Sequence, residues 1–202
     1  MAKKAKKSRV KIVKVSDEKC DYRVLGLDCS SSMVGWGLVG IKEDNPILLA
    51  YGHVKPLDSK NSLLERLNDV CDNLMGICNE LLPTEVAVED IILYMKGRSQ
   101  ASTVVILASF NRVIATVIYR EFKVDVFFQS VQAIRKQIKK SLKLKETIKK
   151  ENMPFIIKDH LCPIFEFTIN KNNEIADVTR DEADGIAVAW SKVLENINEK
   201  PI

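Results

Sequence analysis

The sequence is poor in the residues that build zinc sites and disulfide frameworks. It has two histidines, and its five cysteines include no Cys-x-x-Cys pair. An odd number of widely spaced cysteines argues against both a zinc site and a disulfide-stapled fold. No apolar run approaches the ~20 residues of a membrane span, and the first residues lack the apolar stretch of a signal peptide. We therefore expect an intracellular protein with no membrane segment and no histidine-rich metal site.

What the chain does contain is enough sequence for one domain, with an uneven distribution of charge. Its 202 residues are 46% hydrophobic and 29% charged, which is typical of a single globular domain. Residues 1–20 carry eight Lys or Arg against two acids, whereas the rest is near neutral. A basic arm on a near-neutral body indicates a polyanionic partner such as nucleic acid, and a merely solubilising tail is the alternative. We expect residues 1–21 to be a disordered arm and residues 22–202 to be a single domain.

Apolar runs and turn residues define the expected secondary structure. The sequence predicts five strands, at roughly 22–28, 34–41, 47–55, 85–92 and 124–128. An amphipathic helix is expected from Asn61 to Pro83, and a long apolar helix from about Ser99 to Glu121. A meander of strands followed by alternating strands and helices predicts an α/β domain. Its mixed five-stranded sheet would be flanked by helices.

A second basic segment lies within the body of the chain. Residues 123–158 hold ten basic residues against three acidic ones. Such a one-sided run predicts a positive surface for a phosphate backbone. A solvated helix face is the alternative, although such faces usually alternate in sign. The candidate DNA-binding residues, including one upstream arginine, are Arg98, Arg135, Lys136, Lys139, Lys140, Lys143, Lys149 and Lys150.

Two carboxylates lie on predicted strands where apolar residues are expected. Asp28 ends the first strand, just before the turn Ser30–Ser32, and Glu89 lies within the apolar run of the fourth. A buried carboxylate is costly unless a cation satisfies it, and a divalent metal ion is one such cation. For Asp28 alone, the alternative is a turn aspartate that accepts hydrogen bonds from the next backbone amides.

Two further carboxylates lie near the start of the last predicted helix. Asp181 and Asp184 are three residues apart and so project from the same side of that helix. Thr179 and Glu182 have the spacing of a capping box at its start. Gly185 permits close approach of the helix to the sheet, so we expect Asp184 to point at the sheet.

These four acids would repel one another and raise one another's pKa unless cations occupied the site between them. Oxygen-only ligands suit Mg²⁺ or Mn²⁺. Two such ions ~4 Å apart stabilise the attacking and leaving oxygens of a phosphodiester displacement. We therefore expect two Mg²⁺ ions, with Mn²⁺ as a substitute, at the carboxylates Asp28, Glu89, Asp181 and Asp184.

The same residues resemble a known family. Three motifs appear in order within residues 22–195: Gly26-Leu-Asp28-x-Ser-x(4)-Gly35-Trp36-Gly37, Val86-Ala-Val-Glu89, and Asp181-Glu-Ala-Asp184-Gly-Ile-Ala. They are similar to those of the RuvC-type Holliday junction resolvases of the ribonuclease H-like superfamily. The resemblance implies a ribonuclease H-like fold and catalytic, metal-binding roles for the four acids. It also implies a homodimer that nicks two strands of a four-way DNA junction symmetrically.

The resemblance implies two further features. A lysine-bearing segment follows the fifth strand in the family, and here Arg135 and Lys145 would contact the scissile phosphate, with Lys149 or Lys150 as alternative matches. The family also has a bulky wedge shortly after the strand-four glutamate. The candidates for that wedge are Ile92, Leu93 and Tyr94.

The sequence departs from the usual family pattern in ways that concern its source more than its chemistry. Cys29 stands where proline is common, and the segment between Arg135 and Lys145 lacks the glycines of the bacterial enzymes. Together with the basic arm, these departures favour a phage, viral or organellar relative.

Three functions are compatible with this pattern. The leading hypothesis is a structure-specific endonuclease that cleaves four-way junctions or other branched DNA by two-metal hydrolysis. The second is a ribonuclease H-like nuclease that acts on RNA or an RNA–DNA hybrid. The third is a non-catalytic nucleic-acid-binding module, against which the four intact acids argue.

Overall fold

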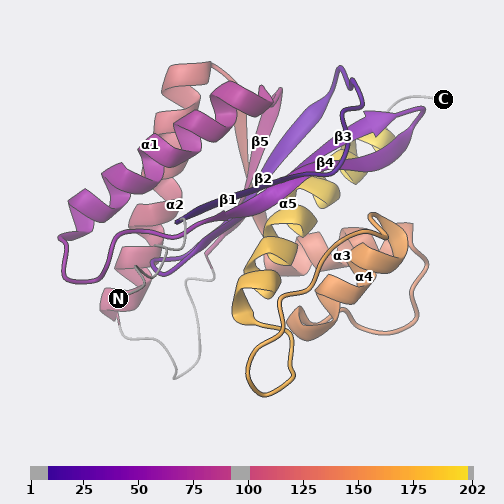
Figure 1. The fold of residues 1–202 in the computed structure, drawn as a ribbon. Coiled ribbons are helices and arrows are strands. Elements are labelled where there is room, and N and C mark those ends of the chain that lie inside the picture. The colour runs from indigo at the N-terminus through magenta and orange to yellow at the C-terminus, as the bar shows by residue number, and fades with distance from the viewer. Residues whose placement is uncertain (1–8, 92–100, 200–202) are drawn as a thin grey trace, which may run out of the picture.

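The computed structural model describes residues 9–91 and 101–199, which form a mixed sheet with helices on both faces (Figure 1). The strands are β1 (Val10–Lys14), β2 (Arg23–Cys29), β3 (Val34–Lys42), β4 (Asn45–Val54), β5 (Glu85–Asp90) and β6 (Asp125–Ser130). The helices are α1 (Leu63–Leu81), α2 (Ala101–Phe122), α3 (Val131–Ser141), the 3₁₀ turn η1 (Lys150–Asn152), α4 (Met153–His160) and α5 (Asp177–Glu199). An α/β domain is confirmed.

The six strands lie in the order β1-β4-β3-β2-β5-β6. Strands β2, β3 and β4 form the expected antiparallel meander, whereas β5 pairs parallel to β2 and β6 pairs parallel to β5. Because β2 and β5 are parallel, their carboxyl ends meet at the same edge of the sheet. That edge is where Asp28 and Glu89 lie.

The sixth strand, β1, comes from the segment that we expected to be disordered. It pairs antiparallel with β4, from Val10 opposite Val54 to Lys14 opposite Ala50. Val10 packs against the core on one face of the sheet, and Val13 packs against the core on the other. Valine and isoleucine favour strands, and here they outweigh the lysines between them. The prediction of disorder is therefore wrong for this stretch, and the sheet has six strands instead of five.

Helices α1 and α2 cover one face of the sheet, and α5, with α3 and α4, covers the other (Figure 1). The expected amphipathic helix is α1, which begins with a capping box between Ser62 and Glu65. Its buried stripe includes Leu67, Leu74 and Ile77, the period of a helix packed on one side. This layer is held by side-chain packing.

Helix α5 lies close enough to the sheet for backbones to touch. A Cβ atom built on Gly185 would lie 2.6 Å from the carbonyl carbon and oxygen of Gly35, so only glycine fits there. This confirms the expectation that Gly185 permits close approach of the helix to the sheet. Asp184 and Ile186 on either side of this contact are buried.

The start of α5 differs from the predicted capping box. The helix begins at Asp177, two residues before Thr179. The hydroxyl of Thr179 accepts a hydrogen bond from the backbone N–H of Thr168 at 2.9 Å, and Glu182 is fully buried. The prediction of a Thr179–Glu182 box is therefore wrong, because both side chains are engaged by other segments.

Helix α2 combines a buried side with an unusually apolar outer side. By length and composition alone, Ser102–Phe122 is the one helix in the described residues that could cross a membrane, with a mean hydropathy of 1.6. This differs from the expectation that no apolar run approaches that length. Phe110 and Ile114 pack in the core against the sheet, and Arg112 near the middle forms an ion pair with Asp90. One side of the helix is thus bound to the sheet.

Candidate functional site

Asp28 and Glu89 lie side by side on adjacent strands. In the pairing of β2 with β5, Leu27 is opposite Val88, so the next residues on each strand are neighbours. Neighbouring strands lie ~4.8 Å apart. Leu27 and Val88 pack in the core beneath α1 and α2. Since side chains alternate along a strand, Asp28 and Glu89 point to the opposite face, toward α5.

Helix α5 brings the other two acids to the same place. A Cβ on Gly35, which pairs with Asp28, would collide with the backbone carbonyl of Asp181. The side chain of Asp184 is 9% exposed and that of Asp181 is 22% exposed. The structure therefore brings together the four predicted acids, from β2, β5 and α5.

The electrostatics of the four acids reflect this proximity. Burial, followed by the charge of Asp184, raises the pKa of Asp28 to about 7. Burial and the charges of Asp28 and Asp184 raise the pKa of Glu89 to about 8. Burial also raises the pKa values of Asp181 and Asp184, although the positive charge of Lys150 opposes the shift in both. The protein alone does not neutralise the charge that it gathers here.

The lysine at this cluster is Lys150, at the start of η1. Its ammonium nitrogen lies 3.0 Å from Oδ2 of Asp184 and 3.3 Å from Oδ1 of Asp181. Burial alone would lower the pKa of Lys150, but the charges of Asp184 and Asp28 raise it above its usual value. Lys145, the sequence-based choice, is exposed on the connection between α3 and η1 and lines a surface pocket with Glu146 and Asp159. Of the candidate lysines, the alternative match Lys150 is therefore the one whose ammonium contacts the acids.

The donor set suits a hard divalent cation. All four side chains offer carboxylate oxygens, which Mg²⁺ and Mn²⁺ prefer. Within residues 9–91 and 101–199, no three His, Cys, Asp or Glu side chains form a preformed metal-binding group. The ammonium of Lys150 instead lies between Asp181 and Asp184. Residual negative charge with raised pKa values is the condition that a bound cation relieves.

Sequence reasoning missed a polar network behind the acids. Oε1 of the fully buried Glu182 lies 2.7 Å from Nδ1 of His53 and 3.0 Å from the ammonium of Lys11. These contacts tie β1 and β4 to the turn of α5 that carries Asp181 and Asp184. The sequence analysis assigned Glu182 to a capping box, and it placed Lys11 in a segment expected to be disordered. No local pattern links the three residues.

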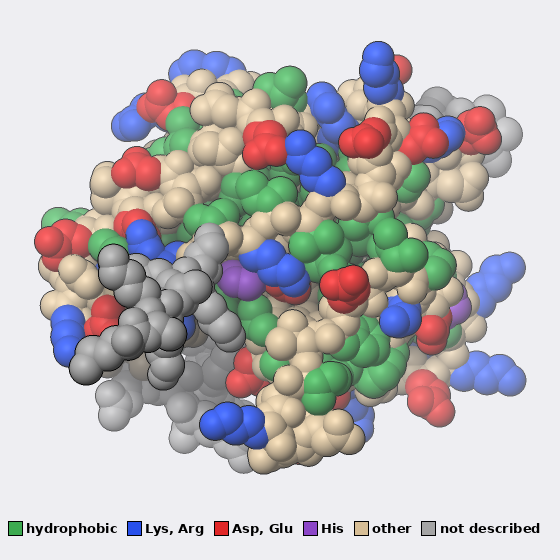
Figure 2. Space-filling view, viewed as in Figure 1, with side chains coloured by type: hydrophobic (Ala, Val, Ile, Leu, Met, Phe, Trp, Pro, Cys, Tyr) green, Lys and Arg blue, Asp and Glu red, His purple; other side chains and the backbone are tan. Residues whose placement is uncertain are grey.

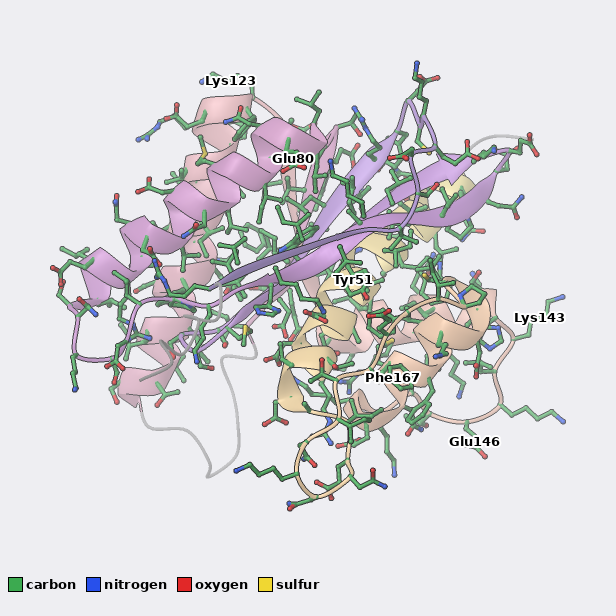
Figure 3. All side chains as sticks on the ribbon, viewed as in Figure 1. Tyr51, Glu80, Lys123, Lys143, Glu146 and Phe167 are labelled. Carbon is green, nitrogen blue, oxygen red and sulfur yellow. The ribbon has the colours of Figure 1, made fainter. Side chains whose placement is uncertain are left out.

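The basic segment forms helix α3 and its connection to η1. Arg135 is close enough to lower the pKa values of Glu89 and Asp184 through its charge, although burial dominates both values. The side chains of Lys143 and Glu146 extend outward from the connection (Figure 3). Where the chain is described, none of the candidate cations of this segment except Lys150 forms an ion pair with a carboxylate. Those without one are Arg135, Lys136, Lys139, Lys140, Lys143 and Lys149.

The wedge candidates Ile92, Leu93 and Tyr94, together with Arg98, lie outside the described residues.

One family profile matches most of the chain. The family described as "Crossover junction endodeoxyribonuclease RuvC" matches residues 24–191. A protein of that name from Paramagnetospirillum magneticum is 33% identical over 90 residues, which cover 42% of this chain and 54% of the relative. The chain spans about half the length of the first such relatives. A relative of the same name from Prochlorococcus marinus is 26% identical, with 86% of this chain and 98% of the relative covered.

A solved structure shares the fold. It is described as "T. thermophilus RuvC in complex with Holliday junction substrate" and is 16% identical to this chain, with a TM-score of 0.67. The superposition covers 88% of this chain and 96% of that one. This likeness confirms the expected ribonuclease H-like architecture, with one strand more than predicted.

Proposed function

The chain belongs to the RuvC family, whose profile matches residues 24–191, and on that premise we propose that it is a metal-dependent endonuclease that cleaves four-way DNA junctions. The observation that carries the proposal is the meeting of Asp28, Glu89 and the acids of α5 at one edge of the sheet, with raised pKa values. A binding module would have no use for carboxylates there, because acids repel a phosphate backbone. The proposed nuclease domain comprises β1 as well as residues 22–202.

Asp28, Glu89, Asp181 and Asp184 would hold two Mg²⁺ ions, for which Mn²⁺ could substitute. When bound, such ions would stabilise both the attacking and the leaving oxygen of the phosphodiester. The positions of the acids are fixed, because glycine contacts hold α5 against β2 and β3, and β5 pairs with β2.

Lys150 would take part in the chemistry in place of Lys145. In the absence of DNA its ammonium bridges Asp181 and Asp184, and its side chain is 44% exposed. The side chain can therefore turn outward toward a phosphate when cations neutralise the acids. There it would stabilise charge that develops on the leaving 3′-oxygen.

The unpaired cations of α3 and its connection to η1 would bind the DNA backbone next to the acids. Such contacts position a substrate without reading its sequence, so we propose recognition mainly by the shape of the junction. The wedge candidates Ile92, Leu93 and Tyr94, and the contact from Arg98, remain proposals from the sequence. A DNA substrate also implies an intracellular site of action.

We propose that the protein acts as a homodimer, because a four-way junction presents two equivalent strands for symmetric cleavage. The outer side of α2 supports this, since Val105 is 62% exposed and Tyr119 is 56% exposed. An apolar surface of this kind on a helix is suited to a second copy of the same chain. Analytical ultracentrifugation of Val105→Asp tests the interface, and an unchanged dimer would exclude this face.

The decisive experiment incubates the protein with three labelled substrates: a four-way DNA junction, a linear duplex and an RNA–DNA hybrid. We expect paired nicks on the junction in Mg²⁺ or Mn²⁺, with 5′-phosphate and 3′-hydroxyl ends, and no products in EDTA. Cleavage of the hybrid in preference to the junction would favour the ribonuclease alternative. Binding with no cleavage at any divalent-ion concentration would favour a non-catalytic module.

A further inference from the structure

A groove opens beside the acids on the side where β1 and α1 begin. Its volume is about 1220 Å³, and it is lined by the start of β1, the turn Ser31–Met33 after β2, and the connection from β4 to α1. Thr168 and Val178 also line it. Since Ser31 lies three residues after Asp28 and Val178 three residues before Asp181, the groove begins next to the proposed active site.

The charged side chains that line this groove are mostly cationic. Asp58 is the one acid among the lining residues. The cations come from three separate segments and are Arg9, Lys11, Lys55 and Arg66. Carboxylates outside the groove already neutralise two of them, through the pairs Arg9–Asp69 and Lys11–Glu182. In the described part of the chain, neither Lys55 nor Arg66 forms an ion pair, so with Asp58 as its one acid the groove keeps a net positive charge.

The side chain of Arg66 is held in place, but its guanidinium has neither an ion pair nor a full set of hydrogen-bond acceptors. Its guanidinium donates to the backbone carbonyl of Ser31 and lies over the ring of Phe110, 5.8 Å from the centroid. Its Nε is buried without a hydrogen-bond acceptor. A donor left without a partner costs free energy, and guanidinium groups bind phosphate oxygens well. The buried Nε cannot reach a ligand, but the guanidinium keeps a positive charge that no carboxylate of the described residues neutralises.

The groove and the α3–η1 segment flank the acids on opposite sides. The first turns of α5 lie between the α3–α4 side and the side where β1 and α1 begin (Figure 1). Lys150 reaches the acids from η1, whereas the groove approaches them from the Ser31–Met33 turn. Elsewhere on the visible face, basic and acidic side chains are intermixed (Figure 2). A DNA strand that crosses the acids would leave the α3–η1 segment and enter this groove.

We propose that the groove binds the phosphodiester backbone of one duplex arm of the DNA substrate, through Lys55 and Arg66. The inference rests on the proposed function and adds a second DNA-binding surface, one that β1 helps to build. Occupation by the chain's own residues 1–8 is disfavoured by charge, because that segment carries four lysines and no acid. Phosphate has the complementary charge.

The test measures junction binding by Lys55→Ala, Arg66→Gln and the double variant, each in an Asp28→Asn background that prevents cleavage. Each lost phosphate contact should lower the slope of log K against log salt by about 0.9, and affinity should fall about threefold to tenfold per residue. Lys19→Ala is the matched control, because Lys19 is exposed at the opposite end of the sheet, before β2 begins. It should change neither quantity.

Cross-linking locates the contact independently of affinity. All five native cysteines are buried, so Lys55→Cys adds the one exposed thiol of the described residues for a photo-reactive group. We expect cross-links to one junction arm within a few nucleotides of the cleavage site. Lys55 is itself exposed, so this variant does not depend on core packing.

The outcomes separate this inference from the function on which it rests. Unchanged salt slopes and no arm-specific cross-link, with junctions still cleaved by the unmodified protein, would overturn the groove alone. An equal loss in the Lys19→Ala control would also overturn it, because the effect would then be one of net charge. A protein that binds no branched DNA overturns both.

Discussion

The two faces of the sheet are packed in different ways. On one face, α1 and α2 contact the strands through interlocking Leu, Ile, Val and Cys side chains, and Gly76 of α1 has open space around it. On the other face, α5 lies directly on the backbones of β2 and β3, where Gly26, Gly35 and Gly185 leave no room for a Cβ. Side chains can adjust to one another, but backbone contacts cannot.

This difference explains why the acids lie on the α5 face. A helix that touches the sheet at backbone distance holds Asp181 and Asp184 at a fixed position relative to Asp28. Metal-ion catalysis needs such fixed positions, since small displacements of ligands are costly. The α1–α2 face needs only to exclude water, and its outer surface is free for a partner.

The largest expected difference between the two faces comes from Asp28 and Cys29, which are adjacent in β2 and point to opposite faces of the sheet. Asp28→Asn should lower the junction-cleavage rate roughly 10³-fold or more, because the amide cannot replace a carboxylate ligand. Junction binding should stay within about threefold. Cys29 is buried in the α1–α2 layer, so Cys29→Ala should cost about 1 kcal/mol of stability and leave cleavage unchanged. Equal losses of binding and cleavage in Asp28→Asn would contradict the assigned role.

Two glycine substitutions compare the layers by stability. A Cβ at residue 185 meets backbone atoms of Gly35 and Trp36 at 2.6 Å, so Gly185→Ala should destabilise the protein by about 2–4 kcal/mol in urea unfolding. Gly76→Ala meets nothing and should stabilise it by about 0.5–1 kcal/mol. Similar effects of the two substitutions would mean that the layers do not differ in tightness.

Substitutions of two lysines compare Lys150, which contacts the acids in the structure, with Lys145, which the family resemblance favoured. Lys150→Ala should lower the cleavage rate about 10- to 100-fold at saturating Mg²⁺, because its ammonium is the one that reaches Asp181 and Asp184. Lys145→Ala should change it less than about threefold. Single-turnover kinetics with matched unfolding curves measures both. The opposite order would restore Lys145 as the functional lysine.

The pH dependence of stability tests the negative charge that is gathered on the α5 face. The folded-state pKa values of Asp28 and Glu89, about 7 and about 8, lie above those of ordinary carboxyls, so the metal-free folded state binds more protons than the unfolded state between pH 4 and 8. The contribution of these two groups to stability should therefore be fully present below about pH 4 and be lost as the pH rises through 7 to 8. Mg²⁺ should restore it at pH 8.

Asp28→Asn provides the control for the pH experiment, because it removes one of the titrating groups. Its metal-free stability should depend less on pH than that of the unmodified protein. A metal-free protein whose stability rises steadily from pH 5 to pH 8 would show that the acids do not repel one another.

Much of the fold and part of the site could be read from local pattern. Period-two and period-3.6 apolar spacing predicted the meander and α1, because burial on one face imposes those periods. The positions of Asp28 and Glu89 within apolar runs marked them as unusual. The sequence did not show which of several similar lysines contacts the acids, because that depends on how the chain runs between α3 and α4. Glu182 was assigned to a local cap, whereas its partners Lys11 and His53 are more than a hundred residues away.

By itself, the sequence determined which carboxylates are in the wrong place for a core and which helix faces are apolar, because both follow from spacing along a few turns or strands. The tertiary structure alone decided that β1 joins the sheet, that Lys150 meets Asp184, and that Arg66 faces a groove without a counterion. Those pairings join segments far apart in the chain, and their free energy depends on distances that no local period encodes.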